Sequence, residues 1–309
     1  MVYHNTDVRP NSPRCAMYKF VSSLLIALLI SGYAAADVDV ATTVRPLQFI
    51  IEAIVDNNGT VTAVIDQNDS PHQYSISPSD RTSLAGADLL VWIGPDFEVF
   101  LADVFSRRAE RGEVLNVSAL VGLQLITSDN NQLDPHLWLD SRNAVLIAEA
   151  FTDRASNLDP PNASSYRENF ARFESEMAAL GDSIDAMFAA PVNSNYLVYH
   201  DAYRYFESQY GIRHGLALLD NPEIQPSMRQ VLELRASIQE LQPDCLLMEA
   251  DSSRSLVPTL LEGRAVQMET IDLLGNRLSG SIAKVDRYAQ LLSNVAEGIA
   301  SCVYQTGPN

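Results

Sequence analysis

The chain has 309 residues, and 39 acidic against 21 basic side chains give it a formal net charge of −18 at pH 7. Such a charge makes nucleic acid and anionic membrane surfaces poor partners. It is typical of a solvated surface, and it also creates a field that attracts cations. The length accommodates two compact lobes better than one.

The N-terminus has the pattern of an export signal. The basic side chains of Arg14 and Lys19 precede an apolar run at residues 20–30, which is too short to span a membrane, and small residues follow it. We expect residues 1–36 to be a signal peptide that is cleaved after Ala36, which makes the mature protein periplasmic. An N-terminal membrane anchor is the alternative, and either Met1 or Met17 can be the start of translation.

Beyond the signal, short apolar runs alternate with segments of helical periodicity. Strands are expected at residues 38–43, 60–65, 88–93, 114–117, 196–199, 216–219, 244–248 and 266–271. Helices are expected to begin at Pro46 and near Ser77, and to cover 97–111, 143–158, 161–190, 202–210, 226–242, 256–261 and 284–303. This alternation predicts an α/β fold with parallel sheets.

One apolar stripe marks a long helix in the middle of the chain. Its seven members recur at spacings of three and four residues: Tyr166, Phe170, Phe173, Met177, Leu180, Ile184 and Met187. This spacing keeps the side chains on one helix face. We expect a rigid connecting helix within residues 161–190, between an N-terminal lobe at 37–160 and a C-terminal lobe at 191–309.

Three histidines and one aspartate carry the chemistry. His72, His136 and His200 lie at predicted strand ends or strand-exit loops, and Asp272 follows a further predicted strand. Because binding loops of parallel sheets gather at the carboxyl ends of the strands, these residues are expected to meet in a cleft between the lobes. Three imidazole nitrogens and one carboxylate suit Zn²⁺, whereas Mg²⁺ and Ca²⁺ prefer oxygen ligands.

The motifs around these residues resemble one protein family. They are Ser70-Pro71-His72-Gln73-Tyr74, Asp134-Pro135-His136-Leu137-Trp138-Leu139, Tyr199-His200-Asp201-Ala202, Asn221-Pro222-Glu223-Ile224-Gln225-Pro226-Ser227 and Asp272-Leu273-Leu274-Gly275. In this order they are similar to signatures of the zinc-binding periplasmic substrate-binding proteins of metal ABC importers (the cluster A-I or cluster 9 family). The resemblance covers the mature chain and implies two βα lobes, one long joining helix and a metal in the interlobe cleft.

The resemblance also implies the ligands and the function. His72, His136 and His200 correspond to metal ligands and Asp272 to the fourth, with Glu249 or a water as the alternatives at that position. A histidine at position 200 points to zinc, because manganese-binding relatives tend to have glutamate there. The expected function is high-affinity capture of Zn²⁺ and its delivery to a membrane ABC permease.

Two other functions compete with zinc import. One is a manganese- or iron-binding receptor, or an adhesin, of the same family. The other is a zinc hydrolase, because three histidines with an open position also make a catalytic site. No HExxH motif is present, and a fourth protein ligand would close the metal to water. We therefore expect no enzyme activity.

Two further features concern the cysteines and a missing loop. Cys245 and Cys302 remain after export, and an even count in an exported chain predicts a disulfide, which relatives of this family also contain. Many zinc-binding relatives carry a histidine-rich loop before the second ligand motif, but residues 121–133 contain no histidine. A periplasmic zinc chaperone is therefore a candidate partner, and the receptor itself is expected to be a monomer.

Several neighbouring residues receive supporting roles. Asp134 and Asp201 are candidate acceptors for imidazole N–H groups, and Tyr74 and Trp138 are expected to pack beside the ligands. His214 is expected to be structural or exposed. Glu223 either orients a ligand or belongs to a turn. Because ligand imidazoles must be deprotonated, zinc affinity is expected to fall below about pH 6.

Overall fold

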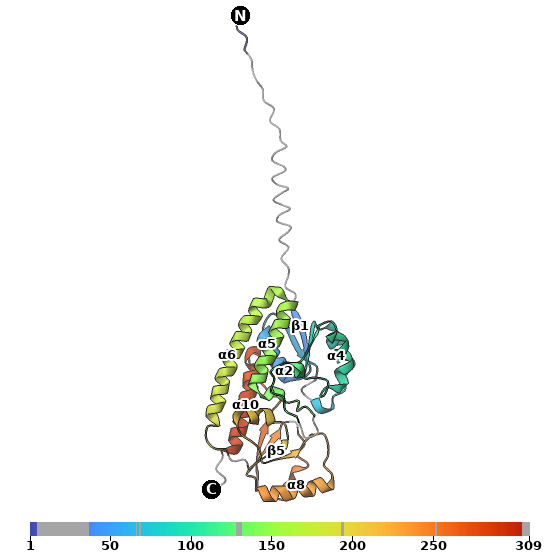
Figure 1. Ribbon diagram of the computed structural model, residues 1–309, viewed down its shortest axis with the longest axis vertical. Coiled ribbons are helices and arrows are strands. Elements are labelled where there is room, and N and C mark those ends of the chain that lie inside the picture. The colour runs from blue at the N-terminus through green and yellow to red at the C-terminus, as the bar shows by residue number, and fades with distance from the viewer. Residues whose placement is uncertain are drawn as a thin grey trace. The chain divides into compact units, whose positions relative to one another are not determined.

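The fold begins at Asp37, where a compact unit separates from the residues that precede it. Figure 1 shows the computed structural model, which describes residues 1–4, 37–65, 67, 69–127, 132–192, 195–250 and 252–304. The expected signal peptide lies outside the described residues except for its first four. Among the helices that the structure describes, none is both long and apolar enough to cross a membrane.

The first sheet has four parallel strands in the order β2-β1-β3-β4. The strands are β1 (Val38–Thr42), β2 (Gly59–Ala63), β3 (Leu89–Trp92) and β4 (Val114–Asn116). Every residue of β3 is buried, as expected for a parallel strand that is covered on both faces. The accompanying helices are α2 (Arg45–Val55), α3 (Pro78–Gly86) and α4 (Ala102–Ala109). The predicted helix at 97–111 is wrong at its start, where a separate 3-10 turn, η2 (Val99–Leu101), precedes α4.

The second sheet repeats this order as β6-β5-β7-β8, again with parallel strands. The strands are β5 (Tyr196–His200), β6 (Leu216–Leu219), β7 (Cys245–Glu249) and β8 (Gln267–Ile271). The helices are α7 (Arg204–Tyr210), α8 (Met228–Leu241), α9 (Val257–Leu261) and α10 (Arg287–Val303). Gly211 ends α7 at a φ of 66°, a left-handed conformation that glycine adopts without strain. The α/β fold with two parallel sheets is therefore confirmed.

Two antiparallel helices, α5 (Ser141–Leu158) and α6 (Ala163–Met187), carry the chain from the first sheet to the second (Figure 1). The seven stripe residues of α6 are buried or half-buried and belong to one hydrophobic core. That core contains Val40 of the first sheet and Val198 of the second. Both lobes therefore pack into the same hydrophobic core.

Polar contacts and one close approach also hold the lobes together. Arg287 of α10 forms an ion pair with buried Glu52 of α2, with Nη1 2.9 Å from Oε2. Gly275 has a φ of 70°, and a Cβ placed there would lie 2.4 Å from Cε2 of Phe49. The segment after β8 therefore packs against the first lobe at a position where only glycine fits.

The predicted disulfide is confirmed. Cys245 and Cys302 are bonded, with their Cα atoms 5.6 Å apart. The bond joins the first residue of β7 to the last turn of α10, and it anchors the C-terminal helix to the second sheet.

Candidate metal centre

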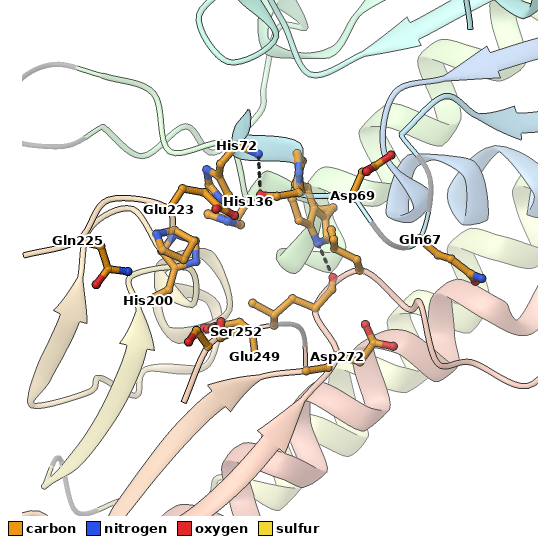
Figure 2. A pocket seen from close by; sticks show the side chains of 18 residues that line it. Gln67, Asp69, His72, His136, His200, Glu223, Gln225, Glu249, Ser252 and Asp272 are labelled. Carbon is orange, nitrogen blue, oxygen red and sulfur yellow. Dashed lines mark hydrogen bonds between the residues drawn. The ribbon is translucent and has the colours of Figure 1, made fainter. Parts of the chain in front are cut away.

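Three imidazoles from three different segments meet in one place (Figure 2). His72 lies in the 3-10 turn η1 (Pro71–Gln73), His136 directly precedes η4 (Leu137–Leu139), and His200 is the last residue of β5. One ring nitrogen of each lies within 4.8 Å of the others. Nitrogens bound to one tetrahedral Zn²⁺ are about 3.4 Å apart, given Zn–N bonds of about 2.0–2.1 Å. Small side-chain shifts therefore suffice to seat an ion.

The position of His136 differs from its prediction. It does not end a strand, because the described residues before it, which exclude 128–131, form an isolated bridge between Thr127 and Leu133. Pro135 has no N–H to donate to a ladder, and the backbone N–H of His136 donates to Asp134 Oδ1 over 3.0 Å. The chain therefore leaves extended geometry here and turns into η4.

Asp134 also orients the His136 ring, as predicted. Its Oδ1 lies 2.8 Å from His136 Nδ1, and both side chains are buried. A proton on Nδ1 satisfies this contact and leaves the Nε2 lone pair for a metal. On the other side, the ring of Trp138 lies 5.3 Å from the His136 ring, and its Nε1 donates to the Leu273 carbonyl over 3.2 Å. Trp138 thus connects this ligand to the second lobe.

Burial keeps the other two imidazoles neutral. Desolvation, followed by the proximity of His136, lowers the pKa of His72 to about 3. The same two causes, with His72 adding to them, lower the pKa of His200 to about 2. Neither imidazole is protonated near neutral pH, so both present free lone pairs to a cation. Protonated rings at this spacing would repel one another, whereas neutral rings can bind one metal ion together.

Asp272 lies in the same cavity but apart from the three imidazoles. It follows β8, and its Oδ2 accepts the backbone N–H of Arg277 over 2.6 Å. Figure 2 shows its carboxylate on the side of the cavity away from the histidines. Among the described residues, the group that can hold a metal comprises the three histidines. The structure therefore brings together three of the four predicted ligands.

Glu249, the alternative fourth ligand, ends β7 and also lines the cavity. Its carboxylate accepts the hydroxyl of Ser252 over 2.7 Å and lies 3.5 Å from the hydroxyl of Tyr203. Burial raises the pKa of Glu249 to about 7. Zinc would therefore have to displace a proton from this group near neutral pH.

The cavity around these groups has a volume of about 560 Å³ and receives side chains from both lobes. A water molecule occupies about 30 Å³ in the liquid, so this space is large enough to hold a hydrated ion. The turn before α8 contributes Glu223 and Gln225 to the wall, which supports a lining role for Glu223 (Figure 2). The backbone N–H of Glu223 donates to Asn221 Oδ1 over 2.9 Å, so the residue is also part of a turn.

Two supporting predictions have different outcomes. Asp201 was expected near a ligand imidazole, but its Oδ1 lies 3.8 Å from His214 Nε2 instead. His214 is structural, as predicted, because its Nδ1 lies 2.8 Å from Oε2 of buried Glu207. That carboxylate also accepts the Tyr196 hydroxyl over 2.6 Å. This network fixes the loop before β6.

The sequence did not single out Phe97, which packs beside a ligand. Its ring lies 5.5 Å from the His72 ring in a T-shaped arrangement. Tyr74, which was expected to pack beside the ligands, donates its hydroxyl to Asp80 over 2.6 Å and lies 5.6 Å from the ring of Phe100. The Gly94-Pro95 turn before Phe97 is the only sequence signal that places an aromatic side chain at this strand exit.

Known proteins resemble this chain over nearly its whole length. The zinc-uptake complex component A periplasmic family (ZnuA) matches residues 40–302. The high-affinity zinc uptake system protein ZnuA of Yersinia pestis is 29% identical over 303 residues, which cover 89% of this chain and 94% of that protein. The Haemophilus ducreyi ZnuA is 26% identical, and the match covers 93% of this chain and 100% of that protein.

A solved structure shows the same fold. The periplasmic zinc-binding protein TroA of Treponema pallidum superposes on this chain with a TM-score of 0.77 at 19% identity. The superposition covers 86% of this chain and 99% of that chain. Since the family match extends from β1 to α10 and includes all three histidines, the chain belongs to the ZnuA family of periplasmic zinc-uptake components.

Proposed function

We propose that this chain is a periplasmic receptor that binds one Zn²⁺ with high affinity at His72, His136 and His200 and delivers it to the permease of an ABC importer. The observation that carries the proposal is the convergence of three imidazoles within 4.8 Å, two of them held neutral by burial. Neutral imidazoles are ligands that zinc prefers. Membership of a zinc-uptake family supplies the transport role.

Asp272 is the proposed fourth ligand. Its carboxylate lines the same cavity and is held by one backbone N–H, that of Arg277. The interaction of a charged carboxylate with a divalent cation is more favourable than its hydrogen bond to a single N–H donor. Rotation of this side chain toward the histidines would close a tetrahedral site of three nitrogens and one oxygen. Glu249 is the less suitable candidate, because burial raises its pKa to about 7.

Manganese is the alternative cargo with a specific observation behind it. A structure of FpvC from Pseudomonas aeruginosa in complex with Mn²⁺ has a TM-score of 0.73 to this chain at 18% identity. Manganese favours oxygen-rich sites, whereas the group of ligands here is dominated by nitrogen. Hydrolysis is set aside, since the family consists of transport binding proteins.

Competition titration of the purified apo-protein tests the cargo and the site together. The protein is titrated with Zn²⁺ and with Mn²⁺ in the presence of a chelator of known affinity, and the series is repeated with His136→Ala. His214→Gln is the matched control, because His214 contacts Glu207 and not the metal centre. Zinc is expected to bind more tightly than manganese, and only His136→Ala is expected to weaken it. Tighter manganese binding would contradict the cargo, and unaltered binding in His136→Ala would contradict the site.

Asp272→Asn and Glu249→Gln then separate the two candidates for the fourth position. Asp272→Asn is expected to weaken zinc binding, and Glu249→Gln to leave it nearly unchanged at pH 7. The reverse result would assign the fourth position to Glu249. Equal affinity of both variants and the parent protein would assign it to water.

The processing and organisation of the chain are part of the same proposal. Residues 1–36 are proposed to be removed as a signal peptide, which leaves an N-terminal lobe at 37–160, a connecting helix at 161–190 and a C-terminal lobe at 191–309. The mature protein is proposed to act as a monomer in the periplasm, with a zinc chaperone as a candidate loading partner. N-terminal sequencing of the exported protein tests the cleavage after Ala36.

A further inference from the structure

Three large apolar side chains lie exposed at the start of α8 and in the turn before it. Ile224, Met228 and Leu232 are 61%, 74% and 57% exposed, and each is four residues from the next. Ile224 lies in the turn before α8, Met228 is the first residue of α8, and Leu232 is one helical turn further on. We call these three side chains the α8 strip.

The α8 strip is held on ordered backbone. The N–H of Ile224 donates to the Asn221 carbonyl over 3.2 Å, which closes the turn that presents this side chain. Ser227 and Gln230 form a capping box at the start of α8, with the Ser227 N–H 2.8 Å from Gln230 Oε1. The backbone beneath these side chains is therefore hydrogen-bonded, and exposed apolar patches mark sites of interaction with a partner.

Packing of α8 on its own sheet does not require the strip. The side chains that α8 buries are Val231 and Ile238, which belong to the core of the second sheet together with Leu197 and Leu246. Met228 and Leu232 are both excluded from that core. Their apolar character is therefore available for contact with another molecule.

The turn that carries Ile224 also forms part of the wall of the metal cavity. Glu223 and Gln225 line the cavity (Figure 2). Ile224 stands between them in the chain. The cavity is the place from which the ion must leave, so a molecule that receives it has to approach this rim. A partner that contacts Ile224 contacts the backbone that also positions two cavity-lining side chains.

The charge around the strip indicates the chemistry of the partner surface. The chain carries a formal net charge of −18, yet Arg229 and Glu233 beside the strip neutralise each other, with Nε 2.8 Å from Oε1. Met228 and Leu232, which flank this internally paired arginine and glutamate, fit an apolar ridge better than a cationic or an anionic surface.

We propose that the α8 strip of Ile224, Met228 and Leu232 is a docking surface for an apolar ridge on the permease that receives the zinc. This inference rests on the proposed function. Docking through the strip places the permease against the turn that lines the cavity, so recognition and access to the cargo involve the same segment. The strip then accounts for apolar side chains that the monomer does not bury.

Zinc uptake by cells tests the inference without knowledge of the permease sequence. The chromosomal gene in the source organism is replaced by one encoding Met228→Asp with Leu232→Asp, and uptake of radioactive zinc is measured under zinc limitation. The matched control is Leu158→Asp, which changes a 48% exposed leucine at the end of α5. The double variant is expected to take up zinc about tenfold more slowly, as for loss of an interface anchor, while the control matches the parent.

Measurements on purified protein keep the result interpretable. The double variant is expected to bind zinc with unchanged affinity, and Leu232→Ser, a milder change, is expected to show a partial uptake defect. Uptake by the double variant equal to that of the control would overturn the inference. So would flotation of the parent protein with phosphatidylglycerol vesicles, or a dimer in sedimentation that the double variant abolishes. If deletion of the gene leaves uptake unchanged, or the parent fails to bind zinc, the proposed function itself fails.

Discussion

The two sheets share one strand order, β2-β1-β3-β4 in the first and β6-β5-β7-β8 in the second, but they hold their metal ligands differently. His72 and His136 of the first lobe lie in or beside 3-10 turns outside the strands. His200 of the second lobe is itself the last residue of β5, which pairs with β6 on one side and β7 on the other. The first lobe thus places its ligands by side-chain contacts, and the second places its ligand by the sheet.

The difference affects how each ligand responds to mutation. His136 depends on Asp134, which accepts both the backbone N–H and the Nδ1 proton of the histidine. The position of His200 is fixed by backbone pairing, and the neighbouring Asp201 faces His214 instead of the metal centre. We therefore expect the first lobe to be sensitive to loss of an outer carboxylate and the second lobe to be insensitive to it.

The largest effect is expected from the ligands themselves, irrespective of the lobe. His72→Ala, His136→Ala and His200→Ala should each weaken zinc binding by more than about 100-fold, since loss of an outer-shell partner alone costs about 10–100-fold. Competition titration measures the effect. If His200→Ala alone retained parental affinity, the second lobe would not contribute a ligand and the comparison of lobes would lose its basis.

Removal of the disulfide is expected to have the next largest effect. The bond lies within the second lobe. Replacement of Cys245 and Cys302 by serine should lower the free energy of unfolding by about 2–5 kcal/mol. Zinc affinity should change little, because Cys245 begins β7 and lies at the opposite end of that strand from the cavity. Urea denaturation measures the loss, and treatment with a reductant provides the control, since it should destabilise the parent and not the variant. A large fall in zinc affinity would show that the bridge also positions the metal centre.

Loss of the outer carboxylate tests the comparison directly. Asp134→Asn should weaken zinc binding by about 10–100-fold, because the amide cannot accept from His136 as a carboxylate does. Asp201→Asn is the matched control in the second lobe and should change zinc affinity by less than about threefold, since its carboxylate faces His214. Equal losses in both variants would mean that the two lobes hold their ligands in the same way.

The sequence predicted the sheets well because buried parallel strands are continuous apolar runs. Residues 216–219 were expected as a strand and form β6 with the same limits. The course of the chain at His136 could not be predicted, since the 3-10 turn there depends on hydrogen bonds to Asp134. The identity of the three clustered histidines was predictable from their motifs.

Side-chain direction was the part that sequence could not supply. Asp272 follows a strand as expected, but the backbone N–H of Arg277 determines where its carboxylate points. Asp201 follows a ligand directly in the chain, yet it turns to His214, which approaches from the loop before β6. Both orientations arise from contacts with residues elsewhere in the fold, and no periodicity encodes them.

The smallest effect concerns pH, and it revises an expectation based on ordinary histidines. An imidazole of ordinary pKa competes with zinc by binding a proton, which lowers apparent affinity by about 25-fold between pH 7 and pH 5. Three independent imidazoles would multiply this factor. Burial, however, lowers the pKa of His72 to about 3 and that of His200 to about 2, so neither gains a proton at pH 5.

Zinc affinity of the apo-protein is therefore expected to fall far less over this range than three imidazoles of ordinary pKa would produce. Competition titration at pH 7, 6 and 5, with correction for the chelator's own protonation, measures it. The low pKa values occur in both lobes, at His72 in the first and His200 in the second, because each ring is desolvated and faces the others. A loss of several hundred-fold would show that at least two imidazoles titrate normally, and hence that the free cleft is wetter than the close approach of the three rings implies.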